Sequence, residues 1–292
     1  MGGAARVSTQ TAAVVGWFDQ SARDLPWRSD PAPWPVLVSE VMLQQTPVSR
    51  VLPVYEEWML RWPTPSALAA EAPGEAVRAW GRLGYPRRAL RLHAAAVRCT
   101  TDFGGDVPSE VTDLRSLPGV GEYTANAVAA FAFGQRRPVL DTNVRRVQAR
   151  WLDGVQWPQS ASVTAAERAR ALDLLPENGL AAAKTSVALM ELGALVCTSR
   201  TPRCATCPIA RSCSWLAAGR PEARTPRRQQ AWHGTDRQCR GRVMAVLRES
   251  TVAVAEPALR HVWDDQDQLG RALQSLMDDG LVVADGPRFR LP

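Results

Sequence analysis

The chain has 292 residues, which is long enough for one large or two smaller domains with an ample hydrophobic core. Hydrophobic residues make up 46% of it, yet no apolar run approaches the length of a membrane span, so we expect a soluble protein. The 35 Lys and Arg residues exceed the 29 Asp and Glu residues, and the net charge of +6 favours a polyanionic partner.

The first ten residues are small and polar, and we expect them to be disordered. From residue 11 to about residue 216, apolar residues recur three or four positions apart, which predicts α-helices. The clearest predicted helices are Pro47–Met59, Pro73–Arg82, Arg87–Thr100, Glu122–Phe133 and Leu180–Leu195. Pro and Gly separate them at short intervals, and no alternating strand pattern occurs before residue 240. The sequence therefore predicts an all-α body.

Residues 217–240 are rich in Arg and broken by Pro and Gly, and we interpret them as a linker. Residues 241–292 form a different unit, with two short strands expected on either side of Asp285-Gly286. Its predicted helices are Gly241–Glu249, Pro257–Trp263 and Gln266–Asp279. Three helices followed by a hairpin are the pattern of a winged helix. A docking unit for nucleic acid or protein and a small appendage without a specific function are both compatible with it.

Glu40 lies in a predicted helix among the apolar residues Val38 and 41–43. A carboxylate so placed either faces solvent or is buried, with a raised pKa and a proton to give. Residues 44–46, Gln-Gln-Thr, supply uncharged donors and acceptors at the expected end of this helix.

Residues 117–121, Leu-Pro-Gly-Val-Gly, separate two predicted helices. Gly119 and Gly121 allow a tight turn, and the following helix would present backbone N–H groups at its positive end, as phosphate sites do. Most Gly-x-Gly turns are only turns. The preceding Leu-Pro and the amphipathic helix that follows favour a helix-hairpin-helix, which holds a DNA backbone without reading its sequence.

Asp141 follows the apolar residues 138–140 and precedes another predicted helix. On its own, this position is explained best by an N-cap, whose side chain satisfies the first backbone N–H groups of the helix. Arg145 and Arg146 fit contacts with phosphate or with the cysteine segment, and a solvated surface equally well.

Four cysteines share the spacing C-x6-C-x2-C-x5-C: Cys197, Cys204, Cys207 and Cys213. Four thiolates in so short a segment can close around one inorganic centre, either a [4Fe–4S] cluster or structural zinc. Disulfides are less favoured, because nothing upstream resembles a secretory signal and a reducing cytosol disfavours them. Cys99 and Cys239 stand alone and are predicted to be inert, partly buried thiols.

Five motifs occur in order: VSEVMLQQT at 38–46, LGY at 83–85, LPGVGEYTA at 117–125, VLDTNVRRV at 139–147 and the four-cysteine segment. Together they resemble the helix-hairpin-helix DNA glycosylases that carry a [4Fe–4S] cluster. Within that superfamily they resemble the adenine DNA glycosylases of the MutY type, which remove adenine mispaired with 8-oxoguanine. The resemblance runs from about residue 12 to residue 216. It favours iron–sulfur over zinc, because this superfamily uses that cysteine spacing.

The resemblance implies an all-α helix-hairpin-helix glycosylase fold in two domains. Residues 29–134 would form a six-helix barrel, and residues 11–28 with 135–216 would form the domain of one [4Fe–4S] cluster, held by the four cysteines. The linker and a winged-helix-like α+β unit at 241–292 would follow. The implied partner is duplex DNA with an 8-oxoguanine:A or G:A mispair, bound by a monomer at the nucleoid in the bacterial cytoplasm. Repair partners would reach the linker or the C-terminal unit.

The resemblance also implies roles for four catalytic residues. Glu40 would protonate adenine at N7 and then help direct the water, and Asp141 would stabilise, or transiently bond to, the cationic C1′. Tyr123 would place its hydroxyl beside this pair, and Asn143 would orient Asp141.

The remaining site residues would hold the nucleic acid, because the target base must leave the stack to be reached. The adenine pocket would be lined by Trp27, Arg28 and Glu191. The positions that match those probing the opposite base and holding the duplex are Gln45, Thr46, Leu83, Tyr85, Gly119, Val120 and Gly121. For Trp27 and Leu83, plain core packing is an alternative.

Tyr123 stands where bifunctional members of the superfamily, such as endonuclease III, have a lysine. That lysine amine attacks the sugar and leads to strand cleavage. Lys184 is the only lysine of this chain and lies well outside the motif. We therefore expect a monofunctional glycosylase without efficient lyase activity.

The chain departs from the family after the linker. Many adenine glycosylases have a C-terminal domain resembling the Nudix hydrolase fold, which recognises 8-oxoguanine, and residues 241–292 do not resemble it. They would either bind duplex DNA and replace part of that reader, or only dock a partner.

Two other functions stay open: a thymine or uracil mismatch glycosylase, and a non-catalytic iron–sulfur DNA-binding or redox-sensing module. Glu40 and Glu191 favour adenine, and the Glu40–Asp141 pair disfavours a non-catalytic module.

Overall fold

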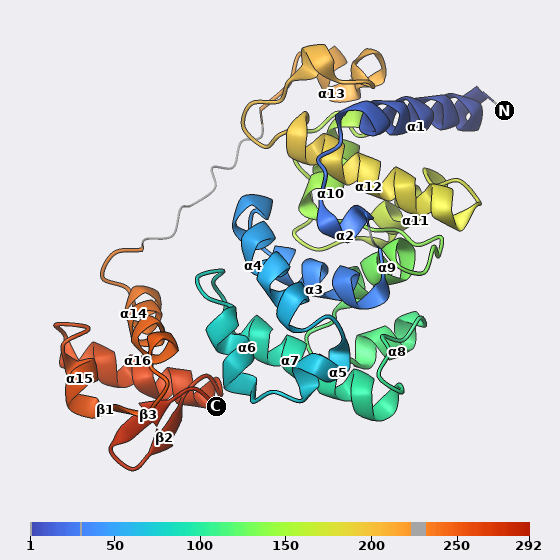
Figure 1. Ribbon diagram of the computed structural model, residues 1–292. Helices are drawn as coiled ribbons and strands as arrows, with labels where there is room; N and C mark the ends of the chain where they lie inside the picture. The colour runs from blue at the N-terminus through green and yellow to red at the C-terminus, as the bar shows by residue number, and fades with distance from the viewer. Residues whose placement is uncertain (1, 30, 223–231) are drawn as a thin grey trace. The chain divides into compact units, whose positions relative to one another are not determined.

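The computed structural model describes residues 2–29, 31–222 and 232–292, and its chain divides into two compact units (Figure 1). The first comprises residues 1–36, 109–112 and 121–227, and the second 37–108, 113–120 and 228–292, as far as they are described. The first residue of the predicted disordered segment, residue 30 of the predicted barrel and residues 223–231 of the predicted linker lie outside the described residues.

The first unit is built around α12, Gly179–Leu195. α1 (Gly2–Ser21) and α10 (Thr142–Trp151) pack along it, as Figure 1 shows, and α9 (Glu122–Phe131) packs on it as well. Apolar side chains from these helices form the core, among them Val14, Val144, Trp151, Leu189 and Leu192. The other elements are α2 (Pro26–Ser29), α11 (Ala165–Asp173), α13 (Ser214–Ala217) and the 3-10 turns Cys204–Thr206 and Ala210–Ser212.

Side-chain caps fix where three helices of this unit begin. Asp141 caps α10, and Asn178 caps α12 by accepting from the Ala181 N–H. Thr164 and Glu167 form a reciprocal capping box at the start of α11. Each cap satisfies backbone donors that a helix N-terminus leaves without an internal partner.

The helical part of the second unit packs around α7, Arg87–Asp102. α5 (Pro65–Ala69) and α6 (Pro73–Ala79) lie against it. The ring of Trp58 meets those of Trp62 and Trp80 edge to face, at centroid distances of 4.9 and 5.6 Å, and all three are buried. This geometry is the one that aromatic quadrupoles favour. The other helices are α3 (Pro33–Leu43), α4 (Val48–Arg61) and α8 (Val111–Ser116).

Residues 232–292, named here the C-terminal module, contain helices and a small sheet. The helices are α14 (Asp236–Glu249), α15 (Glu256–Arg260) and α16 (Gln266–Asp278), and the strands are β1 (Val254–Ala255), β2 (Val283–Asp285) and β3 (Arg288–Arg290). The sheet is antiparallel in the order β1-β3-β2. The predicted all-α body with a small C-terminal α+β unit is therefore confirmed. β1 was not predicted, because two residues are too few to show an alternating pattern.

Three boundaries differ from the sequence-based expectations. α1 begins at Gly2, so residues 2–10 continue a helix instead of being disordered; α1 is anchored on α12 further along, at Val14. The linker ends before residue 240, because Thr235 caps α14 through the Gln238 N–H. The pattern Thr-x-x-Gln is a capping signal that could have shown this. α9, expected in the barrel, belongs to the first unit, because it packs on α12. None of the helices described is both long and apolar enough to cross a membrane.

Candidate active site

The hairpin at residues 117–121 joins α8 to α9. Gly119 has φ +84°, and a Cβ there would lie 2.8 Å from the Cβ of Arg91, so both backbone conformation and space require glycine. Val120 N–H donates to the Leu117 carbonyl at 3.1 Å and closes the turn. Gly121 is the N-cap of α9 and offers no capping side chain. The local geometry is that of a glycine turn leading directly into a helix N-terminus, which suits a phosphate.

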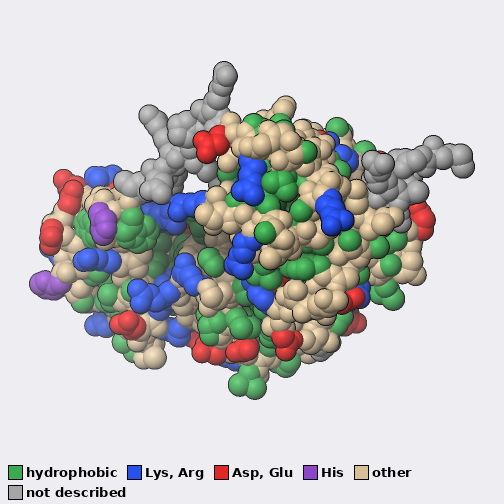
Figure 2. All heavy atoms as spheres, turned by 90° about the horizontal axis from the view of Figure 1, so that it is seen from above, with side chains coloured by type: hydrophobic (Ala, Val, Ile, Leu, Met, Phe, Trp, Pro, Cys, Tyr) green, Lys and Arg blue, Asp and Glu red, His purple; other side chains and the backbone are tan. Residues whose placement is uncertain are grey.

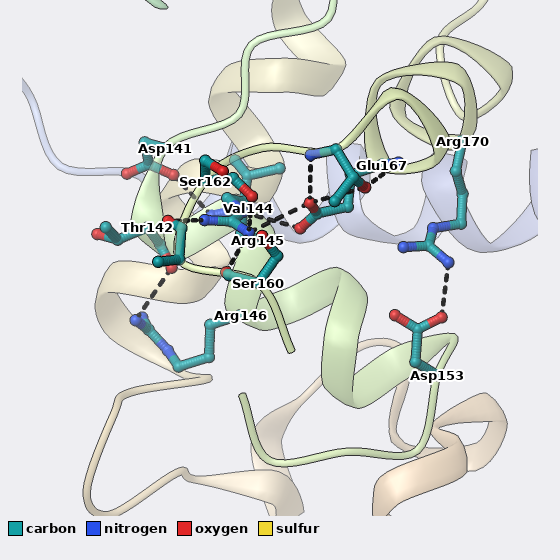
Figure 3. Close-up of polar contacts among 12 residues, drawn as sticks. Asp141, Thr142, Val144, Arg145, Arg146, Asp153, Ser160, Ser162, Glu167 and Arg170 are labelled. Carbon is teal, nitrogen blue, oxygen red and sulfur yellow. Dashed lines mark hydrogen bonds and ion pairs between the residues drawn. The ribbon is translucent and has the colours of Figure 1, made fainter. Parts of the chain in front are cut away.

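Asp141 is the N-cap of α10, as its position in the sequence suggested. One carboxylate oxygen accepts from the Val144 N–H at 2.6 Å, and the other accepts from Asn143 Nδ2 at 2.8 Å. Figure 3 shows the carboxylate at the start of the helix. Burial raises the pKa of Asp141, and it outweighs these hydrogen bonds, which favour the charged form. The carboxylate of Asp141 is therefore more basic than that of an exposed aspartate, because burial destabilises its charged form.

Arg146 holds Asn143 in place. Its Nη2 donates to Asn143 Oδ1 at 2.7 Å and to the Gly193 carbonyl at 2.7 Å, and its Nε donates to the Cys197 carbonyl at 2.8 Å. Gly193 is required here, because a Cβ would lie 2.7 Å from that of Asn143. A continuous set of hydrogen bonds thus leads from Asp141 to the first of the four cysteines. The contact with the cysteine segment was one of the sequence-based alternatives for Arg146.

Arg145 has a different role, which is internal to the first unit. Its Nε donates to Glu167 at 2.8 Å, and its terminal nitrogens donate to the carbonyls of residues 160, 161 and 162 (Figure 3). Its side chain is largely buried. The structure therefore shows Arg145 fastening a loop to α10, in place of a free phosphate contact.

Tyr123 lies in the first turn of α9. It packs on a cluster formed by Ala127, Ala130 and Val139, and Val139 is two residues before Asp141 in the chain. The structure thus brings Tyr123 to the segment that carries Asp141.

Glu191 is completely buried on α12 and is held by two arginines. Arg23 donates through Nε and Nη2 at 2.8 and 2.6 Å, and Arg28 donates through Nη2 at 2.8 Å. Burial alone would raise the pKa of Glu191, but these hydrogen bonds outweigh it and lower the pKa to about 2. Both oxygens are engaged, so the geometry supports a role for Glu191 through Arg28 more than direct contact with a base. Trp27 is buried beside Arg28 in α2.

Replacing Glu191 with glutamine is expected to destabilise the fold by about 2–3 kcal/mol, because two guanidinium groups lose a buried partner. The folded-state pKa is below the ordinary value of 4.5, so this stabilisation is present above pH 4.5 and lost as the pH falls toward 2. Urea unfolding at several pH values measures both effects.

The exposed pair of Lys184 with Asp19 offers a matched control, since it joins α12 to the end of α1, close in the chain to Arg23. Asp19→Asn should cost less than about 1 kcal/mol. Equal losses of unfolding free energy in Glu191→Gln and Asp19→Asn would show that the buried ion pair stabilises the fold no more than the exposed one.

Glu40 lies on α3, in the second unit, and is 6% exposed. Its neighbours Val38 and Met42 are fully buried. Of the two sequence-based alternatives for this carboxylate, the structure shows burial.

Arg88 organises the loops that carry the predicted opposite-base residues, and the sequence analysis missed it. Its guanidinium donates to the carbonyls of residues 41, 42 and 44 at the end of α3, to Gly84 and to the hydroxyl of Thr46. Burial lowers the pKa of Arg88 to about 10, so it stays charged at neutral pH. The last carbonyls of α3 need such a donor, and this need is the signal that could have identified a nearby arginine.

Gln45 and Tyr85 both have left-handed backbones, with φ +57° and +49°. Such conformations are uncommon for residues other than glycine. They are strained, so contacts with the surrounding structure must stabilise them. Tyr85 is 51% exposed, whereas Leu83 and Thr46 are buried. Leu83 therefore fits its core-packing alternative, and Tyr85 stands out toward solvent.

A cavity of about 250 Å³ opens at these loops, and we call it the glutamine–arginine cavity. Its lining residues are Gln44, Gln45, Tyr85, Arg87, Arg88 and Arg91. Amide and guanidinium groups surround it, so it can both donate to and accept from a planar polar ring. Arg91 also contacts Gly119 of the hairpin.

The four cysteines line one small cavity, together with Arg150 and Trp215. Arg150 Nη1 lies 3.4 Å from Cys197 Sγ, and the guanidinium stacks on the rings of Trp157 and Trp215. Among the described residues, no group of three or more His, Cys, Asp or Glu is arranged to hold a metal ion. Burial raises the pKa of Cys207 to about 11. Cys99 and Cys239 are fully buried, where the sequence predicted partial burial.

Comparisons with known proteins agree on one family. Residues 38–171 match the HhH-GPD superfamily of base excision DNA repair proteins. The chain is 51% identical to an adenine DNA glycosylase of Mycobacterium tuberculosis, over 96% of this chain and 92% of that protein. It is 49% identical to the one of Mycolicibacterium smegmatis, over 98% and 97%. A thermostable thymine-DNA glycosylase has a similar structure, with a TM-score of 0.67 and 26% identity over 73% of this chain and 98% of that one.

Proposed function

Because this chain belongs to the adenine DNA glycosylases of the HhH-GPD superfamily, we propose that it excises adenine mispaired with 8-oxoguanine or guanine in duplex DNA. The reaction is hydrolysis of the N-glycosidic bond at the start of base excision repair. The observation that carries the proposal is the half-buried Asp141 at the start of α10, whose raised pKa and hydrogen bond from Asn143 suit a carboxylate facing a transient cation.

The mechanism follows from how poor a leaving group adenine is. Its ring must gain a proton before the bond to C1′ breaks, and the sugar then resembles an oxocarbenium ion. The base must first leave the stack, which the pocket residues Trp27 and Arg28 would accommodate. Glu40 gives the proton at N7 and then helps direct water to C1′. Asp141 stabilises the positive charge. Asn143 orients the Asp141 carboxylate, and Arg146 holds Asn143 in turn.

Lys184 carries the only lysine amine in the sequence. Lys184 is half-exposed on α12 and forms an ion pair with Asp19, 2.7 Å away. Tyr123 occupies the position after the hairpin that a lyase would fill with lysine. The proposed product is therefore an abasic site in an unbroken strand.

A panel of duplexes tests the substrate. Adenine, thymine or uracil is placed opposite guanine or 8-oxoguanine, and the released base is identified by mass spectrometry. We expect release of adenine alone, faster opposite 8-oxoguanine. The structural likeness to a thymine-DNA glycosylase makes thymine release the second candidate. Thymine or uracil release without adenine would overturn the proposal, and binding without release of any base would indicate a non-catalytic module.

The cysteine segment would hold one [4Fe–4S] cluster through Cys197, Cys204, Cys207 and Cys213. The four cysteines line one cavity, so their thiolates can reach a shared inorganic centre, and the cysteine spacing favours iron–sulfur over zinc. When bound, the cluster would cross-link the segment of residues 197–213. Arg146 and Arg150 fasten that segment to α10 by donating to the carbonyls of residues 197–199. Iron and acid-labile sulfide in equal amounts would support the cluster, and zinc in their place would overturn it.

The proposed setting is the nucleoid of a bacterial cytoplasm, where a monomer meets duplex DNA. Its support is the homology to bacterial DNA repair enzymes and the excess of arginine. Figure 2 shows several Lys and Arg side chains on the face that it draws.

A further inference from the structure

The C-terminal module is seated on α6, within the second unit. The Pro292 carbonyl accepts from the Gly74 N–H at 2.7 Å, and a Cβ on Gly74 would lie 2.3 Å from that oxygen. Arg78 donates to the Ser250 carbonyl at 2.8 Å. Close packing against Gly74 and a half-buried guanidinium therefore join the module to this helix.

The module reaches two of the six residues that line the glutamine–arginine cavity. Arg87 Nη1 lies 3.1 Å from Asp279 Oδ1 at the end of α16, and Arg240 of α14 binds the same carboxylate. Arg237, in the first turn of α14, places its guanidinium 5.2 Å from the ring centre of Tyr85 and 5.3 Å from that of Trp232. These are cation–π distances. The module thus restrains both Arg87 and Tyr85.

The lining of the cavity suits the edge of an oxidised purine. Guanidinium groups donate to keto oxygens and ring nitrogens, and the glutamine amides can accept from ring N–H groups. Tyr85 offers an exposed ring for stacking, and its left-handed backbone needs support from outside its own loop. Arg91, which lines the cavity, takes part in no ion pair among the described residues and so is available to nucleic acid.

We infer that the C-terminal module is part of the reader of the base opposite the excised adenine. Arg237 and Asp279 act as positioning residues, which hold Tyr85 and Arg87 against the glutamine–arginine cavity. The inference rests on the proposed function for the identity of that base.

The test compares duplexes with 8-oxoguanine:A and G:A, using the full-length protein. Both dissociation constants and single-turnover excision rates are measured for Arg237→Met and Asp279→Asn. We expect the preference for 8-oxoguanine in binding to fall about fivefold, the scale of one partly exposed cation–π or ion-pair contact. Excision at saturating protein should change little, because neither residue is placed at the reacting atoms.

Two further variants keep the test specific. Arg237→Lys retains a cation over the Tyr85 ring and should recover most of the preference. Arg260→Met removes an exposed arginine of the same module, on α15, and should leave the preference unchanged. Thermal unfolding midpoints show whether each variant is folded.

The preference separates base reading from phosphate contact, because phosphate contacts are common to both duplexes. Equal weakening on both duplexes, or an unchanged preference, would overturn the inference. A wild-type protein that binds both duplexes but releases no adenine would instead contradict the proposed function, while the binding preference still tests the reader.

Discussion

Replacing Glu40 with glutamine is expected to slow adenine excision by about 10³-fold, within the range for loss of a general acid. Glutamine has the same shape and hydrogen-bonding reach but cannot give a proton to N7. Glu40 is buried on α3, so a smaller side chain would also disturb packing. Glutamine keeps the size of the side chain, so the change in rate reports the loss of the proton donor. Single-turnover release of adenine from an 8-oxoguanine:A duplex measures the effect.

Binding and folding are the controls for this prediction. Glu40→Gln should bind the mispaired duplex as tightly as the wild type and unfold at a similar temperature. Glu57→Gln changes an exposed carboxylate on α4 and should leave excision unchanged. Excision by Glu40→Gln at the rate of the wild type would remove Glu40 as the acid.

Replacing Asp141 with asparagine is expected to slow excision by about 10²- to 10³-fold, the scale reported for one preorganised electrostatic partner of a transition state. Asparagine keeps the oxygen that accepts from the Val144 N–H, so the N-cap of α10 is preserved. It loses the negative charge that faces the oxocarbenium ion, and its NH2 group, which is a donor, cannot accept from Asn143 Nδ2.

The stability of Asp141→Asn should equal or exceed that of the wild type at neutral pH. The folded-state pKa of Asp141 is raised, so its charge costs stability above that pKa. The cost is relieved as the pH falls from the folded-state pKa toward the ordinary value near 3.8, where wild type and variant should converge. Urea unfolding across this range measures the difference.

Asp153→Asn is the matched control, because Asp153 pairs with Arg170 just beyond α10 (Figure 3). It should change neither excision nor the pH profile. If Asp141→Asn lost stability and kept its activity, Asp141 would be an N-cap only.

The sequence predicted the features that depend on local pattern. Helix periodicity located α4, α7, α9 and α12, and the glycines of 117–121 predicted a turn that Gly119 indeed requires. Asp141 was predicted both as an N-cap and as a catalytic carboxylate, and the structure confirms the N-cap.

The partners of most buried arginines could not be predicted from the sequence. Arg23 and Arg88 bind groups that are distant in the chain, and only the need of the last α3 carbonyls for a donor pointed to an arginine near them. For Arg146, a contact with the cysteine segment was one of several alternatives. Their partners are carbonyls and one buried glutamate, which become adjacent only after folding. The seating of the C-terminal module on Gly74 and Arg78 was hidden for the same reason.

The central claim is hydrolytic removal of adenine without strand cleavage. The most direct test incubates excess wild-type protein with an end-labelled 8-oxoguanine:A duplex, identifies the released base, and compares the labelled strand before and after alkali. The account predicts free adenine and a full-length strand that breaks only after alkali. Release of another base, or strand breakage without alkali, would contradict it.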